Sequence, residues 1–136
     1  MSAYRILTFD GGGIRGLLSA VLLRRLAAAV PGFLDKVDLL AGTSTGGIIA
    51  LGLARGLKPS ALVQLYRTNG HRIFDDSWLD DLLDLGRLCG AEYDNRRLRD
   101  ILRQVLGAQT KLKQLSKRVV IPTFDLDNEG AGGQVR

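Results

Sequence analysis

The chain has 136 residues, of which 46% are hydrophobic, and this content is sufficient for the core of one domain. Its formal net charge of +5 comes from 19 basic and 14 acidic residues scattered along the sequence, and only 6% of the residues are aromatic. Scattered charge and few aromatic rings argue against a nucleic-acid-binding protein, which needs a basic stripe and stacking platforms.

The sequence also argues against a membrane-spanning or disulfide-stabilised protein. Its longest uncharged stretch, residues 39–54, is short and is interrupted by the glycine-rich segment 42–47. Cys89 is the only cysteine, so no intrachain disulfide framework forms. The first residues lead into a strand-like run without the charged and apolar segments of a secretory leader. We expect a cytoplasmic protein that can contact membranes at their surface.

The first half of the chain predicts two strand-turn-helix units. Residues 4–9 are a β-favouring run that ends at a glycine-rich turn, and leucines at helical spacing follow until Pro31. Residues 36–41 predict a second strand, which leads through another glycine-rich turn into a largely apolar, buried helix over residues 48–54. A helix between two neighbouring strands makes them parallel.

The second half predicts further helices and a third strand. Pro59 suits the first turn of a helix that runs toward residues 69–70, and another helix carries Trp78. The clearest amphipathic pattern begins at Asp94, a good N-cap, and continues until Gly107 ends it. Residues 119–121 begin a third strand. The predicted fold class is α/β, with a mainly parallel sheet sandwiched between helices.

The turn at residues 42–47 (GTSTGG) has the pattern of a nucleophile elbow. In such an elbow a strand turns sharply into a helix and exposes a serine, and small residues two positions away on each side prevent a clash. Gly42 and Gly46 hold these positions around Ser44. The N-terminus of the next helix adds positive potential near a developing oxyanion. The alternative is a tight strand-helix turn that happens to contain a serine.

The turn at residues 10–16 (DGGGIRG) can supply backbone N–H donors. Three successive glycines let the backbone direct its N–H groups toward one point, and each donor of an oxyanion hole contributes about 10²–10³ in rate. Arg15 either holds this loop in place or adds positive charge beside it. The alternative interpretations of this turn are a phosphate-binding loop and a turn without a function.

The same turn also matches the dinucleotide-binding spacing G-x-G-x-x-G through Gly11, Gly13 and Gly16. That site needs an acidic residue at the end of the second strand. Here the strand ends at residues 41–44, and Asp38 lies near its beginning. This placement argues against a dinucleotide site. A dinucleotide- or phosphate-binding domain is kept as the alternative function because the glycine spacing matches.

Together, the two turns resemble the patatin-like phospholipase family, which combines D-G-G-G-x-[RK]-G at the first turn with G-T-S-[TA]-G-G at the second. The similarity covers the whole chain, residues 1–136, which resembles the N-terminal part of a patatin-like domain. The resemblance implies a lipid acyl hydrolase of the phospholipase A or acylglycerol esterase type. It also implies a phospholipid or acylglycerol substrate and no cofactor or metal.

The resemblance assigns a role to each matching position. Ser44 is the nucleophile, and the oxyanion hole is formed by Gly11, Gly12, Gly13 and Arg15. The remaining positions of the two motifs shape the turns: Asp10, Gly16, Gly42, Thr43, Thr45, Gly46 and Gly47.

The general base is the part that the sequence does not supply. The family pairs its serine with an aspartate in a later D-G-[GA] motif, and none follows Ser44. The chain therefore looks truncated after its third strand, and a non-catalytic lipid-binding fragment is a further alternative. His71 is expected in a surface loop after a helix, while Asp125 and Asp127 would need burial to raise their pKa values. An uncovered sheet edge would favour self-association.

Two acidic segments invite a metal interpretation that their patterns do not support. Residues 125–130 resemble the opening of a calcium loop, but Arg136 occupies the position where a bidentate glutamate is required. The aspartates within residues 75–84 suit a solvated helix face. We expect no metal site.

Overall fold

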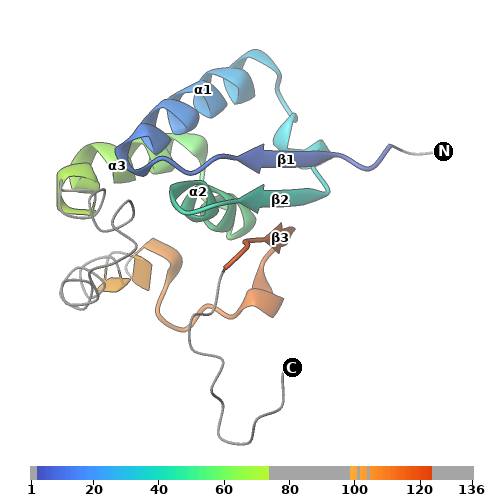
Figure 1. The fold of residues 1–136 in the computed structure, drawn as a ribbon. Helices are drawn as coiled ribbons and strands as arrows, with labels where there is room; N and C mark the ends of the chain where they lie inside the picture. The colour runs from blue at the N-terminus through green and yellow to red at the C-terminus, as the bar shows by residue number, and fades with distance from the viewer. Residues whose placement is uncertain (1–2, 74–98, 101, 104, 124–136) are drawn as a thin grey trace, which may run out of the picture.

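The computed structural model describes residues 3–73, 99–100, 102–103 and 105–123, which form a parallel sheet with helices packed on it (Figure 1). The elements in chain order are β1 (Ile6–Phe9), α1 (Gly16–Ala29), β2 (Leu39–Gly42), α2 (Thr45–Ala54), α3 (Pro59–Ile73) and β3 (Arg118–Val120). Short 3-10 turns lie at Gly13–Arg15, Leu34–Lys36 and Leu112–Gln114, and residues 99–100, 102–103 and 105–106 are helical. The predicted α/β class with a parallel sheet is confirmed.

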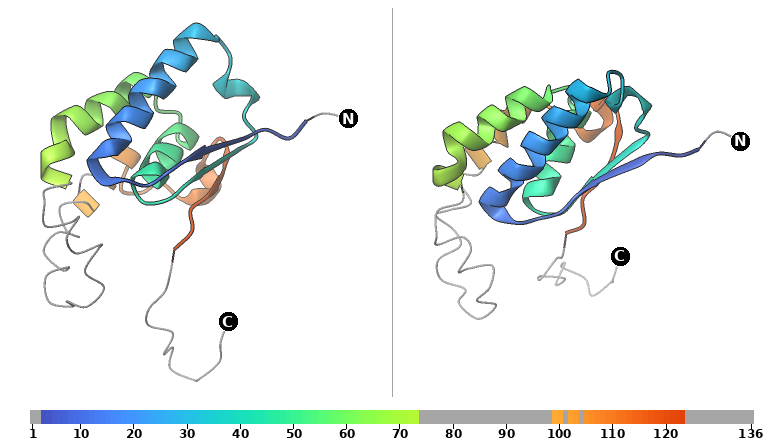
Figure 2. Two further views of the ribbon diagram at one scale, coloured as in Figure 1. Left: turned by 45° about the horizontal axis from the view of Figure 1, so that its top comes forward. Right: turned by 90° about the horizontal axis from the view of Figure 1, so that it is seen from above.

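The three strands lie in the order β1-β2-β3, and both pairs are parallel. Both crossovers therefore step across the sheet in the same direction. Because such connections are right-handed, they place their helices on the same face. Figure 2 shows α1, α2 and α3 together on one side of the strands. In the described part of the chain, no helix has both the length and the apolar character needed to cross a membrane.

The core joins the sheet to all three helices, because its buried residues come from β1, β2, α1, α2 and α3. Along β1 and β2, Phe9 and Leu40 are buried toward the helices, whereas Ile6 is 56% exposed. Helix α2 is buried over most of its length, which explains why it is apolar all round instead of amphipathic. The largest fully buried side chains are those of Tyr66, Leu40, Ile49, Leu62 and Thr45.

Strand β2 and helix α2 begin at other residues than the periodicity indicates. Residues 34–36 form a 3-10 turn, and the Asp38 carboxylate accepts a hydrogen bond from the Arg5 N–H at 2.7 Å, so β2 begins at Leu39. Helix α2 starts at Thr45, three residues earlier than predicted, because the elbow residue itself is its N-cap. The predicted strand at 119–121 is found one residue earlier, at Arg118–Val120.

The expected end of α3 near residues 69–70 is wrong, because the helix continues to Ile73. Gly70 is buried, and a Cβ at this position would collide with the Ile14 side chain. This glycine therefore serves helix packing instead of ending the helix. As a consequence, the backbone of His71 is helical, whereas we expected it in a surface loop. The predicted helix at Trp78 lies outside the described residues.

Candidate active site

Ser44 lies at the junction of β2 and α2 in an unusual backbone conformation. Its φ of 54° and ψ of −123° make it the only non-glycine residue with positive φ in the described part of the chain. Such a conformation costs on the order of 1–3 kcal/mol and persists only where the surroundings enforce it. The residue is exposed although its neighbours Gly42 and Thr45 are buried. The sharp turn therefore presents the serine to solvent, which is the geometry expected of a nucleophile elbow.

The two glycines that flank Ser44 allow the strand and the helix to approach each other. A Cβ on Gly42 would lie 2.6 Å from the Gly47 nitrogen, and one on Gly46 would lie 2.7 Å from the Phe9 carbonyl carbon. Real Cβ atoms essentially never come this close to backbone atoms. The turn is closed by the Gly46 N–H, which donates to the Thr43 oxygen at 2.9 Å. Any side chain at these positions would force the elbow open.

The first glycine-rich turn lies directly against the elbow. A Cβ on Gly11 would lie 3.2 Å from the Cβ of Ser44 and 3.1 Å from the Thr43 carbonyl oxygen. Gly12 and Gly13 have φ values of 155° and 56°, which side chains rarely tolerate. Within the described residues, the N–H groups of these three glycines donate to no backbone carbonyl. A cluster of available N–H donors therefore lies next to the serine. An anionic oxygen placed there could accept hydrogen bonds from them.

Arg15 holds the first turn in place. Its Nε donates to the Gly12 carbonyl at 3.3 Å, and its backbone N–H donates to the same oxygen at 3.1 Å. The two bonds fix the peptide that follows Gly12. Of the two roles considered for this residue, the geometry favours loop support, although the exposed guanidinium also leaves a positive charge near the turn.

A buried pair behind the elbow was not found from the sequence. The Tyr66 hydroxyl, on α3, lies 2.5 Å from the Thr45 hydroxyl and donates to the Thr45 carbonyl at 2.9 Å. Burial raises the pKa of Tyr66 to about 12, and the hydrogen bond with Thr45 partly opposes this rise. Gly16 lets α1 approach the pair, because a Cβ there would lie 2.9 Å from the Tyr66 hydroxyl. A tyrosine in the apolar stripe of a helix could have signalled such a partner.

Comparison with known proteins identifies a family for the sequence. Residues 7–132 match the family model described as "Patatin-like phospholipase". The chain belongs to the patatin-like phospholipase family. No solved structure matches the chain.

Curated patatin-like relatives come from bacteria and plants. The chain is 36% identical over 131 residues to the "cGAMP-activated phospholipase" of Escherichia coli (strain TW11681), covering 90% of this chain and 36% of that protein. It is 32% identical over 126 residues to "Protein teg" of Priestia megaterium, covering 93% of this chain and 38% of the relative. It is 32% identical over 136 residues to "Patatin-17" of Solanum cardiophyllum, covering 89% of this chain and 33% of the relative. The chain thus spans about a third of the length of these relatives.

Asp38, the acidic residue considered for a dinucleotide site, does not lie at the elbow. Asp38 binds the Arg5 N–H before β2 begins, at the opposite end of the strands from both turns, so it is not placed for a ribose at the glycine turn. The side chain of His71 lies outside the described residues, as do Asp125 and Asp127. The two acidic segments at 75–84 and 125–130 and Cys89 lie there as well. In the described ranges, no group of three His, Cys, Asp or Glu side chains could hold a metal ion.

Proposed function

We propose that this chain forms the nucleophile half of a lipid acyl hydrolase of the phospholipase A or acylglycerol esterase type. The observation that carries the proposal is the contact between two turns. Ser44 is exposed on a strained elbow, and Gly11, at the start of a run of available N–H donors, lies against it. A nucleophile beside preorganised donors is the arrangement that acyl transfer requires.

In this reaction Ser44 Oγ attacks the ester carbonyl carbon and gives up its proton to a general base. The carbonyl oxygen becomes an oxyanion that accepts hydrogen bonds from the N–H groups of Gly11, Gly12 and Gly13. Collapse of the tetrahedral intermediate breaks the ester bond, and the departing alcohol takes the proton from the base. Water then hydrolyses the acyl-serine and releases the fatty acid. The general base that the family resemblance implies is an aspartate in a D-G-[GA] motif. This motif does not occur after Ser44 in these 136 residues.

Helix α1 supports a site of action at a lipid surface. Its outward face carries Leu18, 64% exposed, Leu22, 56% exposed, and Leu26, 41% exposed. The exposed Arg25 borders these leucines, the exposed Arg24 lies farther round the helix, and the helix contains no acidic residue. An apolar stripe beside arginines suits the interface of an anionic bilayer. The stripe begins one turn after the glycine loop, and this loop lies against Ser44.

A long-chain alkyl fluorophosphonate tests the assignment of the nucleophile. We expect mass spectrometry to find the phosphonyl group on the peptide that contains Ser44 and to find none in the Ser44→Ala variant. Ser19, Ser60 and Ser116 serve as internal controls, because they lie outside the elbow. Equal modification of these serines, or no adduct on Ser44 in the folded chain, would reject the proposal.

Two parallel measurements separate the alternatives. A dinucleotide-binding domain would bind a nicotinamide dinucleotide in a titration and leave Ser44 unmodified. A non-catalytic lipid-binding fragment would sediment with vesicles and likewise leave Ser44 unmodified. The hydrolase proposal requires the Ser44 adduct and no nucleotide binding.

A further inference from the structure

A second concave site lies at the end of α2 that is remote from Ser44. The cavity has a volume of about 420 Å³, within the range of small-molecule sites. Its apolar lining includes five leucines: Leu51, Leu102, Leu106, Leu112 and Leu115. Leu51 is near the C-terminus of α2, whereas Ser44 is the N-cap of the same helix. A ten-residue helix rises roughly 15 Å, so the cavity is separate from the elbow.

The rim of this cavity is strongly basic. The described lining includes four cationic residues: Arg55, Arg99, Arg103 and Lys111. Among the described residues that line the cavity, none is acidic. Arg99 and Arg103 both line this cavity, and like charges gathered on one small surface repel each other. An anion between them would remove this repulsion.

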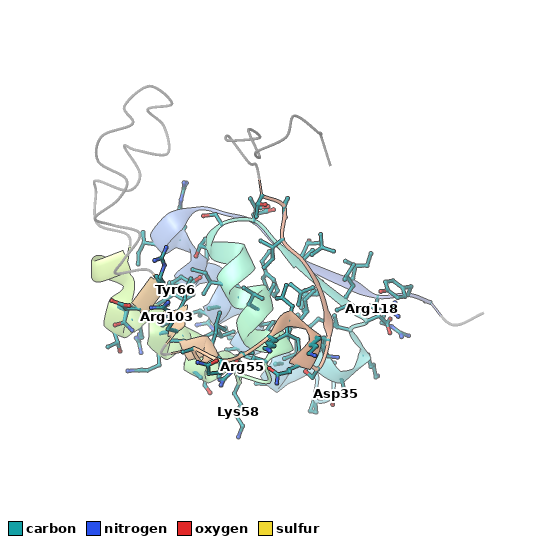
Figure 3. All side chains as sticks on the ribbon, turned by 90° about the horizontal axis from the view of Figure 1, so that it is seen from below. Asp35, Arg55, Lys58, Tyr66, Arg103 and Arg118 are labelled. Carbon is teal, nitrogen blue, oxygen red and sulfur yellow. The ribbon has the colours of Figure 1, made fainter. Side chains whose placement is uncertain are left out.

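Arg55 is fixed at the wall of the cavity. Its Nη1 donates to the Val105 carbonyl at 3.1 Å, and its Nε donates to the Thr110 hydroxyl at 3.3 Å. Figure 3 shows Arg55 and Arg103 on the same side of the molecule. The carbonyl of Ala54 at the end of α2 already accepts from the Ser116 N–H at 2.8 Å and from its hydroxyl at 2.7 Å. This carbonyl therefore does not present an unpaired acceptor that would repel an anion.

We propose that this cavity binds a single-chain anionic amphiphile, with the acyl chain among the leucines and the anionic head at Arg99 and Arg103. Arginine fits a carboxylate or phosphate through paired N–H donors, and the leucines exclude water from the chain. Long-chain fatty acids and single-chain lysophosphatidic acids both have this chemistry. The site is distinct from the proposed nucleophile, so binding there requires no ester hydrolysis.

The test uses the 136-residue chain with Ser44→Ala, so that occupancy of the cavity is measured without turnover. Fluorescent cis-parinaric acid is titrated below its micellar concentration. The matched pair of variants is Arg99→Gln/Arg103→Gln at the cavity and Arg24→Gln/Arg25→Gln on α1, because both remove two exposed arginines. We expect a loss of affinity of about tenfold or more for the first variant and none for the second. Equal effects of the two variants would overturn the proposal.

Two further arms test the apolar and the anionic halves of the site. Leu112→Gln changes a side chain that is 76% exposed, so the core is unaffected, and it should weaken parinaric acid binding. Oleate or lysophosphatidate should displace the probe, and the stronger competitor identifies the preferred head group. Methyl oleate and inorganic phosphate should displace it poorly. Displacement by either of these as effectively as by oleate would contradict an amphiphile site, as would unchanged binding by the Leu112 variant.

Discussion

The hydroxyl of Tyr66 donates to the carbonyl of Thr45, and its oxygen lies 2.5 Å from the Thr45 hydroxyl. Because the tyrosine proton is used for the carbonyl, the threonine hydroxyl donates to the tyrosine oxygen. The two bonds connect α3 to the first turn of α2, immediately after Ser44. A residue that is distant in sequence thus supports the strained backbone of the elbow.

Removal of this hydroxyl should destabilise the fold and loosen the elbow. Tyr66→Phe leaves both the Thr45 hydroxyl and the Thr45 carbonyl without this buried partner, so we expect a loss of about 1–3 kcal/mol in the free energy of unfolding. Urea denaturation measures the loss, and fluorophosphonate labelling of Ser44 should become slower. Gln64→Ala on α3 is the control, because its side chain is exposed and donates to the Thr68 hydroxyl at 3.1 Å. A Tyr66→Phe variant as stable as this control would contradict the supporting role.

Alkaline pH should destabilise the protein through the same residue. The pKa of Tyr66 rises from 10.0 to about 12 in the folded chain, mainly because burial disfavours the phenolate. Below about pH 10 both states keep the proton, so the stabilisation is complete. Between these two values the unfolded chain loses the proton while the folded chain retains it, and stability falls by about 3 kcal/mol. Tyr66→Phe should lack this component, which parallel urea titrations at several pH values would detect.

The close approach of the two turns makes Gly11 sensitive to even one methyl group. In Gly11→Ala the new Cβ would press on the Thr43 carbonyl and on the Ser44 Cβ, so labelling of Ser44 should slow by about tenfold or more. Gly56→Ala is the matched control: its φ of 95° strains an alanine, but nothing lies within 4 Å of the added Cβ. That control should lose about 1 kcal/mol of stability and retain its labelling rate. Similar labelling of both variants would show that the first turn does not shape the site.

Local sequence patterns predicted the elements that position the site but not the contacts between them. The glycines around Ser44 indicated the elbow, because the requirement for small residues there is local. The bond between Thr45 and Tyr66 joins residues 21 positions apart, and only tertiary packing creates it. Gly70 was misleading, since glycine often ends a helix but here makes room for Ile14. The order β1-β2-β3, which leaves one face of the sheet free of α1, α2 and α3, also depends on long-range pairing.

Helix α1 should mediate binding to anionic vesicles. Leu18→Gln/Leu22→Gln removes two exposed leucines from its outward face and should reduce sedimentation with phosphatidylglycerol vesicles about tenfold or more. Arg24→Gln/Arg25→Gln should weaken binding to these vesicles only at low salt, because its contribution is electrostatic. Val120→Thr, at a residue 51% exposed on the sheet, is an apolar-to-polar control of similar shape and should bind normally. Equal binding by all three variants would reject α1 as the lipid-facing surface.

Ester turnover by the 136-residue chain should stay close to background. A serine is a weak nucleophile without an adjacent base, and no D-G-[GA] motif follows Ser44 in these residues. We expect the available N–H donors to support slow labelling of Ser44 but little hydrolysis of a short-chain ester. The measurement compares purified monomeric chain with its Ser44→Ala variant, because association through the edge strands β1 and β3 could alter access to the site. Rapid turnover that disappears in Ser44→Ala would show that the chain contains a base, and His71, Asp125 and Asp127 would be the residues to substitute next.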